Sequence, residues 1–170
     1  MSQKGGPPGV FRFIDKVESY EEGRGLVAGY RLRGDEEFLK DHFEGFPVMP
    51  GVLQIESARQ AGSLFLAAVS GYAVPAYRLC RVEEAKFGQF VKPGSRLRIS
   101  VSLRERKGPR AVVDARIEIE ASDPAQKPLR TLTARLELEP DALSETEKEP
   151  LRQAAREALA PVLSGVPRTR

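Results

Sequence analysis

Residues 41–56, DHFEGFPVMPGVLQIE, bring together the residue types needed for proton transfer. His42 is the only histidine of the chain, and Glu56 follows 14 residues later, after two prolines and two glycines. An imidazole changes charge near neutral pH and can accept a proton, while a carboxyl group can serve as its counterpart. The prolines exclude a continuous helix here, because proline lacks an amide donor and clashes one turn back. We therefore predict a constrained catalytic loop from His42 to Pro50.

The residues that follow this loop are expected to form a helix. Residues 51–70 contain no proline and are rich in leucine and alanine, which favour helix. At 3.6 residues per turn, four of its polar side chains share one arc of about 100°: Glu56, Arg59, Gln60 and Ser63. Apolar residues cover most of the remaining circumference. Such a helix must be wrapped on several sides, and its polar stripe must face something other than open water.

Alternating apolar and polar residues predict strands before and after this helix. The pattern is partial at residues 10–18 and 25–33, and it continues in four later runs: 76–90, 96–106, 111–121 and 129–139. Turns rich in glycine and proline separate the later runs, with no helix between them, so the strands should pair mainly antiparallel. This predicts an α+β fold, with a curved antiparallel sheet of about six strands around one long central helix.

The chain is expected to divide into three parts. Residues 1–9 form a flexible leader, residues 10–140 form the domain with the sheet and central helix, and residues 141–170 form a C-terminal helical extension. Pro150 should lie near the first turn of the added helix, where proline is tolerated. We expect this extension to pack outside the core domain.

The composition excludes several classes of function. The 27 basic and 24 acidic residues are mostly interleaved, and no nucleic-acid-binding signature is present, so no nucleic-acid partner is expected. No stretch reaches the roughly 18 apolar residues of a membrane span, and the first residues lack the apolar run of a secretory signal. The lone Cys80 fits a reducing compartment, so we expect a cytoplasmic protein in which Cys80 is a small buried hydrophobe. With one histidine and one cysteine, no metal and no cofactor are expected.

A longer motif surrounds the candidate loop. His42-Phe43, Gly45, residues 47–53, Glu56 and Gln60 resemble the motif H-F-x-G-x-P-x-x-P-G-V-L-x-x-E-x-x-x-Q of the beta-hydroxyacyl-acyl-carrier-protein dehydratases. The later segment AKFGQFVKPGSRL and the earlier FRFIDKV also resemble segments of that family. The resemblance therefore runs from about residue 11 to residue 139.

The resemblance implies a fold, a reaction and partners. The family has the hot-dog fold, a curved antiparallel sheet around one long helix, and removes water from (3R)-hydroxyacyl thioesters on acyl carrier protein to give trans-2-enoyl thioesters in fatty-acid synthesis. It implies a homodimer whose sites are shared between subunits, with assembly into a trimer of dimers left open. Carried onto this chain, His42 is the base, Glu56 the acid, and the Gly51 amide polarises the thioester carbonyl. The substrate-binding residues would be Val52, Gln60, Phe43 and Pro50.

This assignment is chemically reasonable. A thioester acidifies its neighbouring C–H bond, and a neutral imidazole, with a reference pKa near 6.5, is a suitable acceptor. An amide at a helix N-terminus can stabilise the charge that develops on the thioester oxygen. Glu56 lies one turn into a mostly apolar helix, so we expect burial to raise its pKa and allow it to protonate the departing hydroxyl.

Three residues depart from the family pattern. Asp41 stands where glycine usually precedes the histidine, and Glu44 stands where proline often follows it, which adds two carboxylates beside the proposed base. Arg59 replaces the small residue that usually precedes Gln60, and it could pair with Glu56 and keep it ionised. These departures leave open how well the site performs dehydration.

Other interpretations therefore stay open. A hot-dog thioesterase would use Glu56 as base or nucleophile, and a non-catalytic acyl-thioester binder would use neither candidate. His42 could be a structural hydrogen-bonding residue, and Gly51 could simply ease the turn into the helix. For an acidic carrier protein, Arg96 and Arg98 are weak docking candidates. The acyl chain length cannot be read from the sequence.

Overall fold

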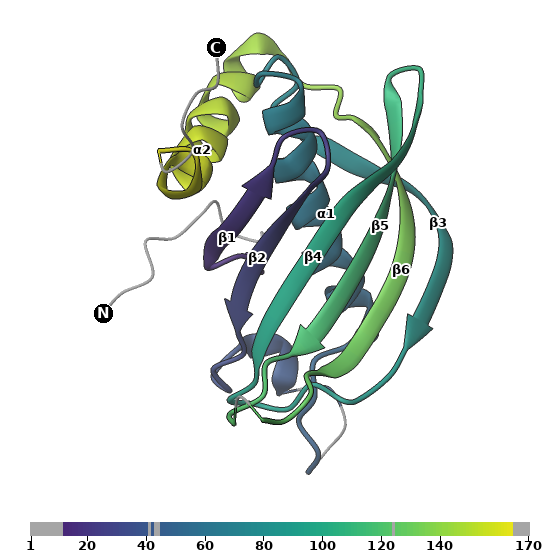
Figure 1. The fold of residues 1–170 in the computed structure, drawn as a ribbon, viewed down its shortest axis with the longest axis vertical. Coiled ribbons are helices and arrows are strands. Elements are labelled where there is room, and N and C mark those ends of the chain that lie inside the picture. The colour runs from purple at the N-terminus through teal and green to yellow at the C-terminus, as the bar shows by residue number, and fades with distance from the viewer. Residues whose placement is uncertain (1–11, 41, 43–44, 124, 165–170) are drawn as a thin grey trace.

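The computed structural model describes residues 12–40, 42, 45–123 and 125–164. A six-stranded sheet curves around helix α1, Gly51–Val69 (Figure 1). The strands are β1 (Lys16–Glu21), β2 (Gly25–Arg31), β3 (Tyr77–Phe87), β4 (Arg96–Lys107), β5 (Arg110–Ile119) and β6 (Leu129–Pro140). A 3-10 helix, η1, spans Glu37–Leu39, and a second helix, α2, spans Glu145–Leu163. The predicted α+β architecture is confirmed.

The sheet order is β1-β2-β4-β5-β6-β3, and every neighbouring pair is antiparallel. Because side chains alternate between the faces of a strand, one face of the sheet is apolar and packs on α1. In β4 this face carries Leu97, Ile99 and Val101, all buried. The helix approaches closely at Gly62, where a Cβ atom would lie 2.8 Å from Leu138 Cδ1. The core therefore lies between α1 and the concave face of the sheet.

The first strand begins later than the alternation predicted. Residues 12–15 are not in a strand, and β1 starts at Lys16. Phe13 and Ile14 are nevertheless buried in the apolar core, where the Phe13 ring packs against the rings of Tyr30 and Phe38. The backbone amide of Phe13 donates a 2.9 Å hydrogen bond to Gln60 Oε1 of α1 instead of joining the sheet. Residues 10 and 11 lie outside the described part of the chain.

The expectation that Cys80 is buried was wrong. Cys80 is exposed, and the pairing of β3 with β6 shifts register between Leu79 and Arg81. A β-bulge leaves its extra residue unpaired. Cys80 is that residue, on a strand at the edge of the sheet.

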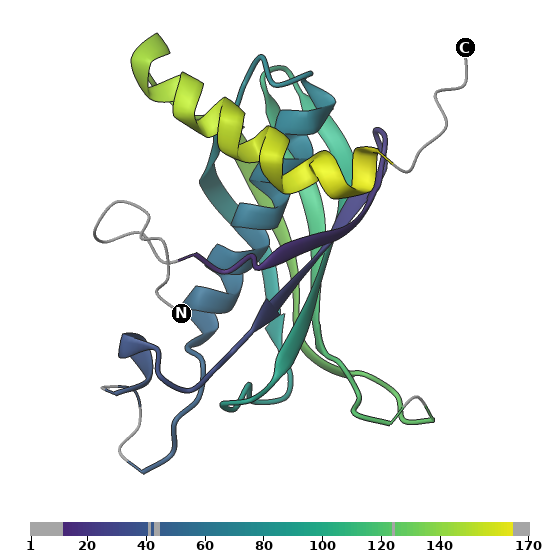
Figure 2. The same ribbon diagram turned by 90° about the vertical axis from the view of Figure 1, so that its left-hand side faces the viewer.

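Helix α2 packs against β1 and the end of α1 (Figure 2). It begins with a capping box formed by Ser144 and Glu147, and Pro150 is its sixth residue, just beyond the predicted first turn. The helix lies outside the sheet, yet Leu159 belongs to the buried apolar cluster of the domain. Arg152 Nε also donates to the Tyr72 carbonyl over 3.0 Å. The division between domain and extension stays a prediction.

Within the described residues, neither helix has both the length and the apolar character that crossing a membrane requires.

Candidate active site

The C-terminal end of the loop before α1 is attached to the segment that connects β3 to β4. Val48 and Met49 are buried, and the Met49 amide donates a 2.9 Å hydrogen bond to the Val91 carbonyl. Pro50 is the N-cap of α1, and its carbonyl accepts hydrogen bonds from two amides of the first turn. His42 lies in a bend and is partly buried. The predicted constrained path therefore holds over the described part of the loop.

Three predicted residues of this loop cannot be placed. Asp41, Phe43 and Glu44 lie outside the described residues. The proposed substrate contact of Phe43, and the carboxylates expected beside His42, therefore stay predictions.

Gly51 is the first residue of α1. The first four amides of a helix have no carbonyl partner within it, so this end offers hydrogen-bond donors and the positive end of the helix dipole. The Phe87 ring packs directly against this glycine: a Cβ atom on Gly51 would lie 2.8 Å from Phe87 Cε1. The close approach of an aromatic ring is thus a structural reason for glycine here, beside the proposed role of its amide.

Glu56 lies in the second turn of α1, and its side chain is 34% exposed. Arg59 Nε donates to Oε2 over 2.8 Å, and Arg59 Nη2 donates to Oε1 over 2.7 Å. Gln60 Nε2 also donates to Oε1, over 3.0 Å. The expected pairing of Arg59 with Glu56 is confirmed, and both carboxylate oxygens are engaged.

The remaining polar groups of the stripe bind the neighbouring chain segments. Arg59 Nη1 donates to the Tyr77 carbonyl over 2.8 Å, and Ser63 Oγ accepts from the Tyr77 amide over 2.9 Å. Gln60 Oε1 accepts from the amide of Phe13. These contacts agree with the prediction that the stripe faces something other than open water. The stripe therefore joins α1 to the start of β3 and to the segment before β1.

The pKa of Glu56 is lowered, not raised as expected. Burial acts to raise it, but the hydrogen bonds from Arg59 and Gln60 and the charge of Arg59 together outweigh burial. Apolar surroundings were visible in the sequence, yet the arginine one turn away decides the direction of the shift. Glu56 is therefore a carboxylate at neutral pH.

The other substrate-binding candidates lie around the N-terminus of α1. Val52 is 71% exposed, and Pro50 is partly buried. Sequence reasoning missed three exposed aromatic residues, which we call the aromatic cluster: Phe46, Phe87 and Phe90. The rings of Phe46 and Phe90 pack edge to face with centroids 5.7 Å apart. The resemblance of the AKFGQF segment to the family was the signal that could have identified two of them.

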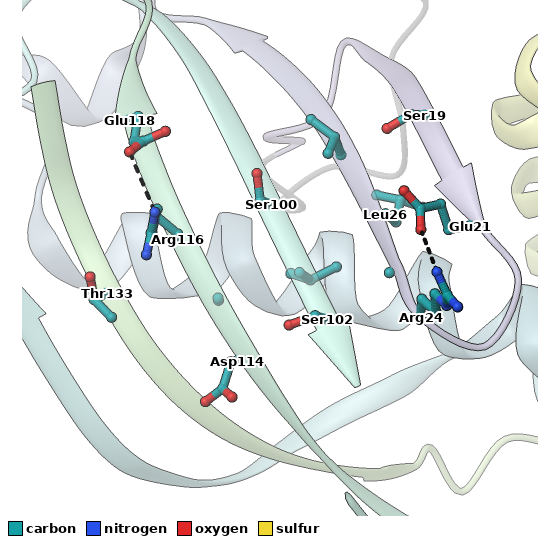
Figure 3. A pocket seen from close by; sticks show the side chains of 14 residues that line it. Ser19, Glu21, Arg24, Leu26, Ser100, Ser102, Asp114, Arg116, Glu118 and Thr133 are labelled. Atoms are coloured by element: carbon teal, nitrogen blue, oxygen red, sulfur yellow. Dashed lines mark ion pairs between the residues drawn. The ribbon is translucent and has the colours of Figure 1, made fainter. Parts of the chain in front are cut away.

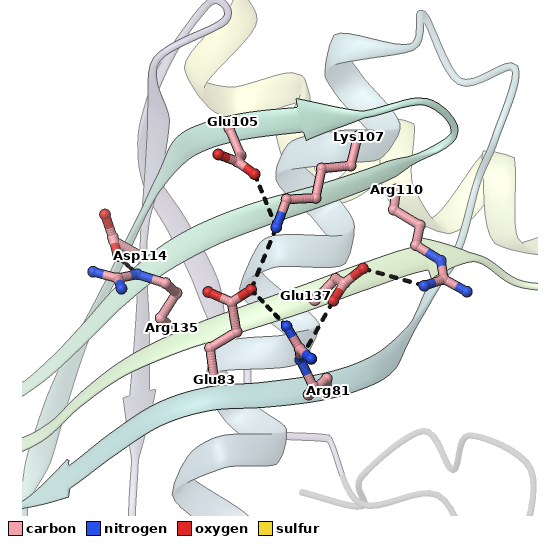
Figure 4. A network of polar contacts seen from close by, with 8 residues as sticks. All are labelled: Arg81, Glu83, Glu105, Lys107, Arg110, Asp114, Arg135 and Glu137. Carbon is pink, nitrogen blue, oxygen red and sulfur yellow. Dashed lines mark hydrogen bonds and ion pairs between the residues drawn. The ribbon is translucent and has the colours of Figure 1, made fainter.

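Two polar features on the outer face of the sheet lie away from these candidates. One is a pocket of about 580 Å³ on the side of the sheet opposite α1 (Figure 3). It is lined by serines and charged residues and contains no histidine. The other is a network of ion pairs (Figure 4), in which the largely buried Glu137 contacts Arg81 over 3.6 Å and Arg110 over 3.3 Å. Because its charges largely balance, we interpret the network as stabilising the sheet.

A curved antiparallel sheet wrapped around one long helix, with a polar stripe on that helix, defines a hot-dog domain. The family model described as a FabA-like domain matches residues 6–124. The 3-hydroxyacyl-[acyl-carrier-protein] dehydratase FabZ of Pediococcus pentosaceus is 39% identical over 102 residues, which cover 60% of this chain and 68% of that protein. The chain therefore belongs to the FabA-like family of 3-hydroxyacyl-[acyl-carrier-protein] dehydratases.

Solved structures support the same fold at low sequence identity. The dehydratase heterocomplex ApeI:P from Xenorhabdus doucetiae matches with a TM-score of 0.58 and 18% identity, over 76% of this chain and 99% of that one. An acyl-CoA hydrolase from Staphylococcus aureus, solved with coenzyme A, matches with a TM-score of 0.57 and 14% identity, over 85% and 90% of the two chains. Both a dehydratase complex and a hydrolase thus share this fold, so the fold alone does not select the reaction.

Proposed function

We propose that this chain dehydrates (3R)-hydroxyacyl thioesters on acyl carrier protein to trans-2-enoyl thioesters, as a step of fatty-acid synthesis. Its membership of the dehydratase family supports this reaction. The observation that carries the proposal is that the His42 loop leads directly into a helix bearing Gly51 at its start and Glu56 in its second turn.

In the proposed reaction, His42 removes the α-proton of the thioester. The negative charge that develops on the thioester oxygen is stabilised by the Gly51 amide and the positive end of the α1 dipole. Glu56 contacts the hydroxyl group that departs from Cβ. Val52, Pro50 and Gln60 are proposed to border the substrate, and Phe43 would complete this set.

We also propose that the working form contains at least two copies of the chain, with each site shared between subunits. Two features support a second copy. Strand β3 is at one edge of the sheet and pairs only with β6 among the described strands. Val52 and the aromatic cluster expose apolar surface near the same edge, and such surface commonly marks an interaction site. Assembly beyond the dimer stays open.

The carrier and the location of the protein also remain proposals. Arg96 and Arg98 are exposed on β4 and have no ion pair within the described residues, so they stay candidates for docking an acidic carrier. Arg96 is the first residue of β4. A cytoplasmic location and the absence of a cofactor are still predictions.

Thioester hydrolysis is the second candidate function. One observation favours it: Glu56 is held as a carboxylate. A base or nucleophile needs that form, whereas a general acid needs the protonated one. Dehydration at this site therefore has to proceed with Glu56 in its ionised form.

Purified protein supplied with a crotonyl or longer enoyl thioester separates the candidates. Hydration to the 3-hydroxyacyl thioester and release of free thiol are followed in the same reaction. We expect hydration without thiol release, and loss of hydration in His42→Ala. Thiol release without hydration would replace the proposal by a thioesterase, and the absence of both products at every chain length would favour a non-catalytic binder.

A further inference from the structure

Arg59 holds the Glu56 carboxylate at both oxygens. Its Nε and Nη2 atoms donate to Oε2 and Oε1 over 2.8 and 2.7 Å, which is the bidentate geometry of strong charge-assisted hydrogen bonds. Its Nη1 atom donates to the Tyr77 carbonyl of β3. The Arg59 side chain is 24% exposed, so the pair is partly shielded from water. Arg59 therefore fixes the candidate carboxylate relative to the sheet.

The other described groups that face this pair are neutral. Gln60, four residues after Glu56 on α1, donates to Oε1 and accepts from the Phe13 amide ahead of β1. Tyr77 of β3 presents its backbone carbonyl to Arg59, and its phenol ring is buried. Within the described part of the chain, Arg59 is the charged side chain that acts on Glu56. Protonation of Glu56 would weaken the interactions with both of its partners.

The carboxylate still has room to accept one more hydrogen bond. An ionised carboxylate offers about four acceptor positions, two on each oxygen. Among the described residues, Oε1 accepts from Arg59 and from Gln60, whereas Oε2 accepts from Arg59 alone. An acceptor position on Oε2 thus remains for a donor such as the hydroxyl group of a substrate.

We infer that Arg59 is a positioning residue that keeps Glu56 ionised throughout the reaction, so that Glu56 accepts a hydrogen bond from the substrate hydroxyl while His42 alone carries the proton. This inference rests on the proposed dehydratase function and specifies how that site works. In this scheme Glu56 is not the acid, because it accepts a hydrogen bond from the substrate hydroxyl and orients it.

The proton and electron balance closes with this chain's own groups. His42 takes the α-proton, and the electron pair of the broken C–H bond forms the Cα–Cβ double bond as the Cβ–O bond breaks. The departing oxygen keeps its own hydrogen, which points to Glu56 Oε2, and receives the α-proton from the imidazolium. Water leaves, and His42 is neutral again without any co-reactant.

The pH dependence of turnover distinguishes this scheme from one with a separate acid. If Glu56 were the acid, the active enzyme would carry one proton shared between two groups, and the rate would fall on the alkaline side. If His42 alone carries the proton, the active enzyme holds no proton on either group. We therefore expect kcat/KM for hydration to rise with pH through one ionisation and then stay level up to about pH 9.

Arg59 variants test the positioning role. In Arg59→Met the burial of Glu56 remains while its cation is lost, so we expect kcat to fall about 10²-fold, as for a displaced catalytic group. Glu56 should then protonate at higher pH, so the acidic side of the pH profile should show a second ionisation that wild type lacks over the same range. Arg59→Lys keeps the positive charge but lacks the bidentate geometry. It should therefore recover part of the activity, with a pH profile between those of wild type and Arg59→Met. Arg24→Met, which removes an exposed cation in the β1–β2 turn, is the control and should behave as wild type.

A direct titration keeps the test independent of turnover. The Glu56 carboxyl carbon, labelled with ¹³C and followed by NMR in the intact protein, should titrate at lower pH in wild type than in Arg59→Lys or a folded Arg59→Met. Any one of three results would overturn the inference. These are a bell-shaped pH profile of kcat/KM in wild type, an unchanged kcat in Arg59→Met, and a Glu56 carboxyl group that titrates at the same pH in wild type and in the variants. A wild-type enzyme with neither hydration nor dehydration would instead overturn the proposed function, and the titration would still decide whether Arg59 keeps Glu56 ionised.

Discussion

The arginine one turn after Glu56 changes what this carboxyl group can do. Burial alone would favour the neutral acid, as expected from the apolar helix around it. The bidentate contact with Arg59 and the hydrogen bond from Gln60 reverse that preference. A single side chain in the stripe therefore moves Glu56 from a proton donor toward a fixed, charged acceptor.

The same contact should appear in the acid stability of the protein. Because the pKa of Glu56 is lower when folded, its contribution to stability is present above its ordinary pKa and is lost as pH falls through the folded value. Urea unfolding at neutral pH and at about pH 3.5 should therefore show a smaller acid-induced loss in Arg59→Met than in wild type. Arg24→Met removes an exposed cation, so its acid-induced loss of stability should be as large as that of wild type. Equal acid sensitivity in all three proteins would mean that Arg59 does not lower this pKa.

Helix α2 extends the core beyond the part of the chain that the family model matches. Ala155 and Leu159 are buried against the domain, while Leu151 and Leu163 on the same helix are each 39% exposed. One face of the extension therefore contributes to the core.

Two alanine substitutions on α2 measure this contribution. Leu159→Ala should lower the free energy of unfolding by about 2–5 kcal/mol, because it leaves a cavity in a fully buried position. Leu151→Ala on the same helix should change it by less than about 1 kcal/mol. Urea unfolding at pH 7 compares them, and equal small losses would show that α2 is only loosely attached.

The sequence predicted elements better than their contacts. The proline-free run placed α1 to within one residue of its observed end, and alternation located all six strands. The start of β1 was missed because Phe13 bonds to a helix side chain, which no strand pattern encodes. The exposure of Cys80 follows from a bulge in the pairing of β3 with β6, and such a register shift depends on the partner strand. At the site, the sequence showed that Arg59 lies one turn after Glu56. Whether burial or pairing with Arg59 sets the direction of the Glu56 pKa shift could be decided only from the distances in the structure.

At the scale of the whole molecule, the three most exposed large apolar side chains among the described residues are Val52, Phe90 and Phe87, near the N-terminus of α1 and the end of edge strand β3. Val52 and the aromatic cluster lie there, beside the loop that carries His42. A second copy covering this region would shield these groups from water and could bring His42 of one subunit toward Glu56 of the other. The single chain is therefore expected to be an incomplete enzyme.

Mixed dimers of two inactive variants decide whether His42 and Glu56 form one shared dehydration site. His42→Ala and Glu56→Ala should each lose at least about 10²-fold in hydration activity while remaining folded. A verified heterodimer of the two contains one doubly damaged site and one intact site, so re-annealed mixtures should recover up to about half of the wild-type rate per heterodimer, whereas re-annealed His42→Ala alone should recover nothing. Heterodimers without recovered activity would contradict a site shared between subunits, and a fully active His42→Ala protein would remove the histidine from the reaction.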